Sequence, residues 1–378
     1  MGFFGFTWYF IVVFLFVLTV LIYVHEWGHY WVARKNGVRV EVFSIGFGPE
    51  LFGWTNDAGT RWKISAIPLG GYVKMFGENM EDEETGEPIE MTPEEEAVSF
   101  HHKTLGQRAA IVFAGPAVNF LFAIATFAAL AMFQGAAHPL AVVGNVQTGS
   151  AAAEAGFVSG DKIVAVDDTE IRRFSELRDI VMVSAEKRLT FHILRDGNNQ
   201  TIVATPKSAS LSDDTGGERS IGRLGVSPHP EHIEYEKHNP AMALWVGTKQ
   251  TATLTVNILV YVGDMFTGAR STDDLGGPIR IAQISGEMAQ KGFDYVILLM
   301  AMLSVNLGLI NLFPIPMLDG GHLVFYAAEA IRGKPLGPRV QEYGFRFGLI
   351  LVLVLMVFVT WNDLVHLRVF EIIKDLFT

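Results

Sequence analysis

The chain has 378 residues, of which 50% are hydrophobic and 18% charged, and its formal net charge at pH 7 is −11. Its mean hydropathy of +0.30 is high for a soluble globular protein, so membrane spans are expected. The acidic balance argues against nucleic acid as a partner, because a surface that binds nucleic acid is usually basic. The chain contains no cysteine, which excludes disulfides and thiolate metal ligands.

The N-terminal segment is the first expected span, at about residues 6–33. Met1 to Val24 carries no charged side chain and approaches the roughly 20 apolar residues that cross a bilayer. A cleaved signal peptide fits poorly, because no Lys or Arg precedes the apolar run. In addition, His25-Glu26 follows where small residues should mark a cleavage site.

Directly after this uncharged run comes His25-Glu26-Trp27-Gly28-His29, which matches the pattern H-E-x-x-H. Residues four apart lie on one face of a helix, so the two imidazoles could bind one zinc ion. Glu26 would then act as general base on zinc-bound water. Three ionisable side chains at the end of an apolar span are costly, which argues against an inert set of hydrogen-bonded residues.

The short region at 38–75 is expected to form a β-hairpin, with strands around Val40–Phe47 and Trp62–Ile67 and a turn at Asn56–Gly59. Its exposed edge could hold a substrate in extended form, although a hairpin without a substrate role is a close alternative. Glu78 to Glu96 is an acidic segment that we expect to be a solvated loop. Together with a second span at about 107–133, these segments make up a first membrane half at 1–137.

The stretch at 138–228 predicts a small α+β domain inserted between the membrane halves. Short helices are expected at Ser150–Gly156 and Ser175–Ser184, and a hairpin turns at Asp196-Gly197. Ser208–Glu218 has the composition of a linker. Residues 229–292 are expected to be helical and interfacial, with Thr251–Gly263 too short for a span.

The second membrane half, 293–378, contains expected spans at about 295–313 and 345–362. The fold class is therefore a polytopic α-helical membrane protein with four transmembrane helices. Lys and Arg residues favour the cytoplasmic side, and here they cluster after the first span, before the second, and between the third and fourth: Arg34, Lys35, Arg39, Lys103, Arg108, Arg332, Lys334, Arg339 and Arg346. This pattern places the hairpin in the cytoplasm and the inserted domain outside.

A zinc site needs a third protein ligand. Asp319, in the stretch Asn311-Leu-Phe-Pro-Ile-Pro-Met-Leu-Asp319-Gly-Gly, is favoured over Glu41, Glu50 and Glu78. In a four-span topology the first and third spans both run inward, so Asp319 reaches the depth of the two histidines. The alternative for Asp319 is an ordinary Asp-Gly turn.

These residues resemble the site-2 protease family of intramembrane zinc metalloproteases, and within it the bacterial members that regulate the sigma-E response. The resemblance covers essentially the whole chain. It rests on H-E-x-x-H in the first span and N-x-x-P-x-P-x-L-D-G-G after the third. A run in the inserted domain, G-S-A-A-A-E-A-G…G-D-K-I-V-A-V-D, also resembles PDZ domains.

The resemblance implies that His25, His29 and Asp319 bind Zn²⁺, that Glu26 is catalytic, and that Asn311, Pro314 and Pro316 hold substrate. It implies single-span, anti-sigma factor-like substrates, and also remnant signal peptides, cut in the bacterial inner membrane. The oligomeric state is left open.

Other classes of protein fit the sequence less well. An inactive membrane scaffold that binds partners through the PDZ-like domain is the main alternative, and intact Glu26 argues against it. A transporter would be expected to contain paired repeats, and the sequence shows none. A di-iron enzyme would need more histidine clusters than His101-His102.

Overall fold

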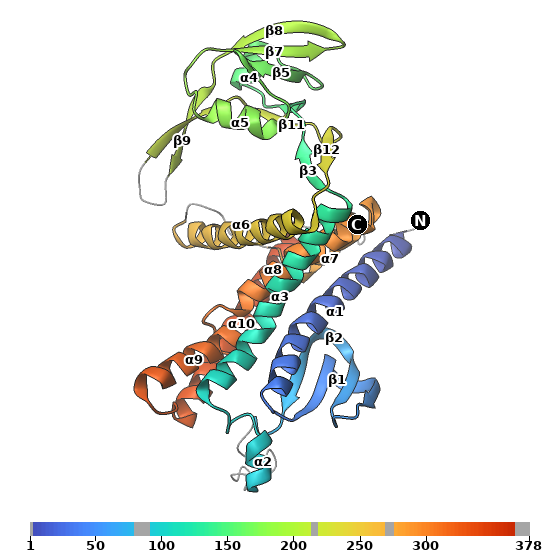
Figure 1. Ribbon diagram of the computed structural model, residues 1–378, viewed down its shortest axis with the longest axis vertical. Helices are drawn as coiled ribbons and strands as arrows, with labels where there is room; N and C mark the ends of the chain where they lie inside the picture. Colours follow the sequence, from blue (N-terminus) through green and yellow to red (C-terminus); the bar gives the residue numbers. More distant parts are fainter. Residues whose placement is uncertain (1–2, 79–90, 213–217, 269–275, 367–378) are drawn as a thin grey trace, which may run out of the picture. The chain divides into compact units, whose positions relative to one another are not determined.

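The computed structural model describes residues 3–78, 91–212, 218–268 and 276–366. The chain divides into two compact units (Figure 1). The first, here called the helical unit, comprises residues 1–129 and 241–378, and the second, here called the inserted unit, comprises residues 130–240. Each unit is described by itself.

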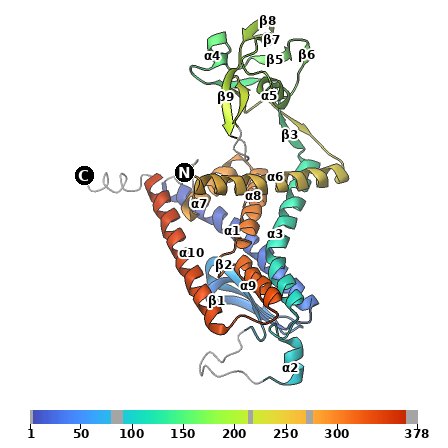
Figure 2. The same ribbon diagram turned by 90° about the vertical axis from the view of Figure 1, so that its left-hand side faces the viewer.

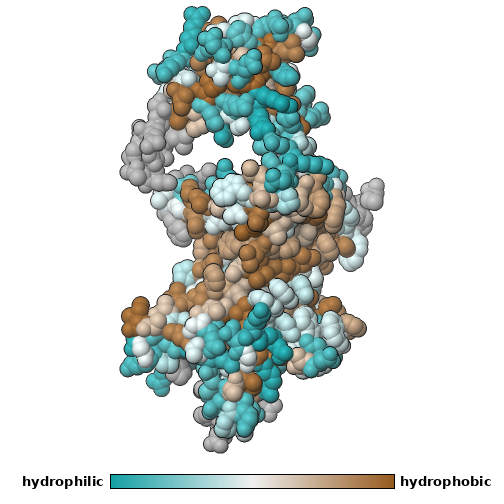
Figure 3. Space-filling view, viewed as in Figure 1, coloured by the Kyte–Doolittle hydropathy of each residue, from teal (hydrophilic) through white to brown (hydrophobic). Residues whose placement is uncertain are grey.

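Four helices are long and apolar enough to cross a membrane, which confirms the predicted polytopic membrane protein. They are α1 (Phe3–Lys35), α3 (Leu105–Phe133), α8 (Phe293–Asn311) and α10 (Pro338–His366). As expected from Pro314 and Pro316, α8 ends at Asn311. Figure 3 shows hydrophobic side chains gathered in a broad band over the helices of the helical unit, as a lipid-facing surface requires.

Within the helical unit, α8 packs against both α1 and α3. Val17 and Leu21 of α1 meet Val296 and Met300 of α8 in one buried cluster. A second cluster joins α8 to α3 and α6 and contains four buried residues, Ala123, Phe127, Ala301 and Val305. Apolar side chains thus hold the helix that leads to Asp319 beside the helix that carries the histidines.

The helical unit also contains α6 (Pro240–Phe266), α7 (Pro278–Lys291) and α9 (Asp319–Arg332). The apolar segment Thr251–Gly263 lies within α6, which does not reach the hydropathy of a membrane span. Figure 2 shows α3 and α10 splayed apart, with the sheet of β1 and β2 near their lower ends.

The predicted hairpin at 38–75 is more elaborate than two simple strands. β1 (Val40–Thr55) and β2 (Arg61–Met75) are antiparallel, and both bend. The first part of β1 lies between two parts of β2: the start of β2 pairs with one of its edges and the end of β2 with the other. Ile45 of β1 is therefore opposite both Ile64 and Gly71 of β2. Residues 71–75 therefore form an outer segment of the sheet. Gly46, Gly48 and Gly70 have positive φ, which allows these bends.

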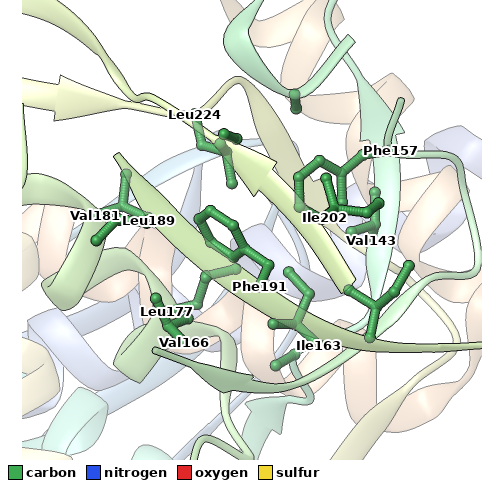
Figure 4. Packing of buried hydrophobic residues seen from close by; sticks show 14 of the residues in the cluster. Val143, Phe157, Ile163, Val166, Leu177, Val181, Leu189, Phe191, Ile202 and Leu224 are labelled. Atoms are coloured by element: carbon green, nitrogen blue, oxygen red, sulfur yellow. The ribbon is translucent and has the colours of Figure 1, made fainter. Parts of the chain in front are cut away.

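The inserted unit contains a four-stranded antiparallel sheet in the order β6-β5-β7-β8. Its strands are β5 (Lys162–Val166), β6 (Thr169–Glu170), β7 (Leu189–Arg195) and β8 (Asn198–Ala204), and α4 (Ala151–Ala155) and α5 (Phe174–Met182) accompany them. Figure 4 shows the core, where Phe157, Ile163, Leu177 and Phe191 converge. Short strand pairs complete the unit: β3 (Ala136–Pro139) with β12 (Ile233–Glu236), and β4 (Val143–Val146) with β11 (Val226–Pro228).

Two predicted loops contain regular structure. Ser208–Glu218, expected to be a linker, contributes to β9 (Lys207–Ser212) and β10 (Glu218–Arg223), which pair antiparallel. The backbone N–H and C=O groups of each strand form hydrogen bonds with those of the other strand, and the polar composition of the segment does not predict this pairing. Most of the acidic segment lies outside the described residues, but its end forms α2 (Pro93–Val98). There Thr92 and Glu95 form a capping box, which sets the start of a helix even in an acidic run.

A buried carboxylate joins α10 to α7. Asp363 is 2% exposed and accepts hydrogen bonds from three backbone N–H groups at the start of α7, those of Gly277 (2.8 Å), Ile279 (3.0 Å) and Arg280 (3.1 Å). The N-cap of α7 (Gly277) has no side chain, so Asp363 supplies the cap from another helix.

Replacing Asp363 should loosen the start of α7. Asp363→Ala leaves three N–H groups at the start of α7 without their acceptor, and we expect amide hydrogen exchange of residues 276–282 to accelerate about 5–30-fold, as loss of a cap worth about 1–2 kcal/mol predicts. Glu342→Ala, at an exposed position of the same helix, should leave that exchange unchanged. Equal exchange in both variants would contradict the capping role.

Candidate metal centre

His25 and His29 lie one turn apart near the C-terminal end of α1. They are 9% and 8% exposed, and their Nε2 atoms are 3.3 Å apart. The rings meet edge to face at a centroid distance of 4.8 Å. The i, i+4 spacing of the motif thus directs two imidazole nitrogens to one point, as the helix period requires.

The structure brings Asp319 to the same point. Asp319 is the first residue of α9, which begins after the connection 312–318 that follows α8. Successive turns make this connection compact. Gly320 and Gly321 let it fold tightly against α9, because a side chain on Gly320 would collide with the Phe313 carbonyl and one on Gly321 with the Ile315 carbonyl. The Asp319 carboxylate consequently reaches back to α1.

The three side chains have the geometry of a zinc site. Asp319 Oδ2 lies 3.2 Å from His25 Nε2 and 3.5 Å from His29 Nε2. Ligands bound about 2.0–2.2 Å from a tetrahedral zinc lie about 3.3–3.5 Å apart. Asp319 Oδ2 is also buried without a hydrogen-bond donor among the described residues, which is the state of a ligand atom. Two imidazoles and a carboxylate therefore fit zinc with a fourth position left for water or substrate.

Glu26 lies next to these ligands and against the sheet. A Cβ atom on Gly71 of β2 would lie 3.2 Å from Glu26 Cγ and still closer to Ile22 of the same helix. The absence of a side chain at Gly71 thus lets the outer sheet segment pass beside Glu26. This places a carboxylate, a metal site and the edge of a sheet together.

The other acidic residues weighed as a third ligand have different partners. Glu41 pairs with Lys74 and Glu50 with Arg61, while Glu78 accepts from the Met75 amide. The described residues contain one group of three or more potential ligands, and it consists of His25, His29 and Asp319.

The predicted substrate-holding residues lie between α8 and Asp319. Asn311 is the last residue of α8, Pro314 is exposed and Pro316 half-buried in the connection. The carbonyl of Pro316 contacts α10 where Gly348 leaves room for it. Their role in holding substrate stays a prediction.

Helix α3 supplies a side of the site that the sequence analysis missed. Ile111, Gly115 and Asn119 recur every four residues and therefore share one face. The Ile111 carbonyl lies 2.9 Å from His29 Nδ1, and the Asn119 amide lies 3.0 Å from His25 Nδ1. A Cβ atom on Gly115 would lie 2.2 Å from His29 Nε2. The available signal was a polar Asn with a Gly-Pro pair inside an uncharged span.

Comparison with known proteins identifies the family. The profile of peptidase family M50 matches residues 13–355, which include the three candidate ligands and Glu26. The chain belongs to peptidase family M50. It is accordingly a metalloprotease of the site-2 type that uses zinc, as the sequence predicted.

Relatives of this M50 peptidase match over nearly their whole length. A protein of Rhizobium meliloti named as a zinc metalloprotease is 44% identical over 364 residues, covering 94% of this chain and 96% of its own. Another, from Agrobacterium fabrum, is 44% identical, covering 95% and 97%. The metalloprotease MmpA of Caulobacter vibrioides is 38% identical over 389 residues, covering 96% and 97%.

In this M50 peptidase, adding one methyl group at Gly115 should displace His29 from the ligand position. Gly115→Ala is expected to lower zinc affinity at least tenfold, measured by competition with a chelator. Gly106→Ala is the matched control, because it makes the same change in the same helix and a Cβ atom there meets nothing within 4 Å. Wild-type zinc affinity in Gly115→Ala would show that α3 does not limit the site.

Proposed function

We propose that this M50 peptidase cleaves transmembrane segments of single-span membrane proteins, with His25, His29 and Asp319 holding the zinc and Glu26 acting as catalytic base. The observation that carries the proposal is the triangle of ligand atoms, with sides of 3.2–3.5 Å, at the end of a membrane helix. Because the site is built on α1, the peptide bonds that reach it belong to segments entering from the bilayer.

Bound zinc would supply a Lewis acid that polarises the scissile carbonyl and lowers the pKa of water. The protein's own contribution begins with Glu26, which takes a proton from the attacking water and returns it to the leaving amine. The backbone of Gly71 lies against this side chain and limits its positions. The apolar clusters around α1 and α8 restrict water to the site itself.

Extended binding of the substrate follows from the sheet. A helical peptide bond is shielded by its own hydrogen bonds, so the segment must unwind before attack. Residues 71–75 pair with the first part of β1 on one edge, and no described strand pairs with their other edge. A substrate added there as a strand would have its backbone satisfied while it runs beside Glu26. Asn311, Pro314 and Pro316 would hold the substrate from the α8 side.

We further propose that the protein resides in the bacterial inner membrane in contact with lipid, with α1 running inward and the inserted unit outside. Basic residues near the ends of the four spans support this orientation. On this assignment the substrates are anti-sigma factor-like proteins already shortened outside the membrane, and remnant signal peptides.

The inserted unit is proposed to act as a PDZ-like domain that inspects substrate ends. Its sequence resemblance is accompanied by a hollow of about 180 Å³, lined among others by Lys207, Arg223 and Gly225. The Arg223 guanidinium suits the carboxylate of a freshly cut chain, whereas Lys207 is paired with Glu154. An inactive scaffold working through this unit was the alternative, and membership of a peptidase family does not favour it.

Glu26→Gln separates catalysis from metal binding. The variant should keep its zinc, since Glu26 is not a ligand, while cleavage of a defined transmembrane peptide in detergent falls by about 10²–10⁴-fold. Asp319→Ala should instead lose zinc. Unchanged cleavage by Glu26→Gln would reject it as the base, and stoichiometric zinc in Asp319→Ala would place the third ligand elsewhere.

The absence of cysteine allows a clean test of orientation. Val183→Cys in the inserted unit and Asp57→Cys in the β1–β2 turn are both at exposed positions. In cells whose outer membrane is permeable and whose inner membrane is intact, a membrane-impermeant maleimide should label Val183→Cys. It should label Asp57→Cys only after the cells are lysed. The reverse pattern would overturn the orientation while leaving the zinc centre intact.

A further inference from the structure

The two histidines have unlike partners on α3. His29 Nδ1 faces the backbone carbonyl of Ile111 at 2.9 Å. A carbonyl only accepts hydrogen bonds, so Nδ1 must carry the proton, and the lone pair of Nε2 is then directed to the metal position. The backbone of α3 therefore fixes His29 in the tautomer that binds zinc.

His25 instead faces a side-chain amide. Asn119 is fully buried, its Nδ2 lies 3.0 Å from His25 Nδ1, and its Oδ1 has no hydrogen-bond partner among the described residues. The backbone at this position is also held, because the Ser304 hydroxyl of α8 donates to the Asn119 carbonyl at 2.9 Å. A buried, anchored amide with one unpartnered atom calls for an explanation.

The direction of the amide decides which nitrogen of His25 is available. With Nδ2 donating to Nδ1, the ring proton lies on Nε2, which is 3.3 Å from His29 Nε2 and 3.2 Å from Asp319 Oδ2. A protonated Nε2 cannot bind a metal. If the amide turns about its Cβ–Cγ bond, Oδ1 accepts a proton from Nδ1, and the Nε2 lone pair is freed. The two orientations have nearly the same shape.

We propose that Asn119 is a positioning residue for the zinc centre: its side-chain oxygen accepts the Nδ1 proton of His25 and so selects the tautomer that binds the metal. In the alternative orientation the proton stays on His25 Nε2, among the ligand atoms, and blocks metal binding by this ring. The inference rests on the proposed metal centre. It adds that α3, which contributes no ligand, determines the metal affinity.

The test measures zinc binding to the purified full-length protein by competition with a chelator. Asn119→Leu and the smaller Asn119→Ala remove the acceptor and should weaken zinc binding about 10–100-fold, as loss of such a partner does in other zinc sites. Asn119→Asp can only accept at neutral pH, and it should restore affinity to within about threefold of wild type. Gly106→Ala, a change at an open position of the same helix, is the control and should bind zinc like wild type.

Replacement of zinc by Co²⁺ provides a second measurement of how the metal is bound. The visible absorption of Co²⁺ should match wild type in Asn119→Asp and shift in the variants that lack an acceptor. Wild-type zinc affinity in both Asn119→Leu and Asn119→Ala would overturn the proposal, as would an Asn119→Asp protein that binds as weakly as they do. Failure of the metal centre itself looks different, since His25→Ala would then retain stoichiometric zinc.

Discussion

The close approach of α1 and α3 is the constraint on which the active site depends. A Cβ atom on Gly28 would lie 2.5 Å from the Ala114 carbonyl, and one on Gly115 would lie 2.2 Å from His29 Nε2. Two small residues therefore allow the helix backbones to pass at a distance that side chains would prevent. At this crossing the histidines lie between the helices, where polar groups of α3 can reach both rings.

Packing around the crossing of α1 and α3 also positions α8, α9 and Asp319. Gly308 of α8 lies against Pro116 and Asn119 of α3, and the apolar clusters on its two sides fix the depth of its end. The connection to α9 then turns back and delivers Asp319. An ion pair between Arg108 of α3 and Glu329 of α9, with a separation of 2.7 Å, holds the far end of that helix. The proposed third ligand is thus placed by contacts with the same helix that orients the two histidines.

Much of this arrangement could be predicted from the sequence, because it follows from local patterns. Uncharged runs predicted the four membrane helices, Pro314 and Pro316 predicted the end of α8, and the spacing of His25 and His29 predicted a shared face. The bent sheet could not be predicted, since its doubled pairing of β1 depends on glycine conformations and on contacts with α1. The roles of Gly115 and Asn119 were likewise hidden, because they arise only where two helices distant in sequence cross.

The order of elements along the chain has a mechanical consequence. The sheet follows α1 directly and contacts it again at Gly71, so the proposed base and the proposed strand for the substrate lie on neighbouring, packed elements. If the other helices were to separate to admit a membrane segment, the base and the strand would keep their spacing as long as this contact holds. The position of the cut, counted in residues along the substrate, would then be set by the sheet and not by how far the helices open.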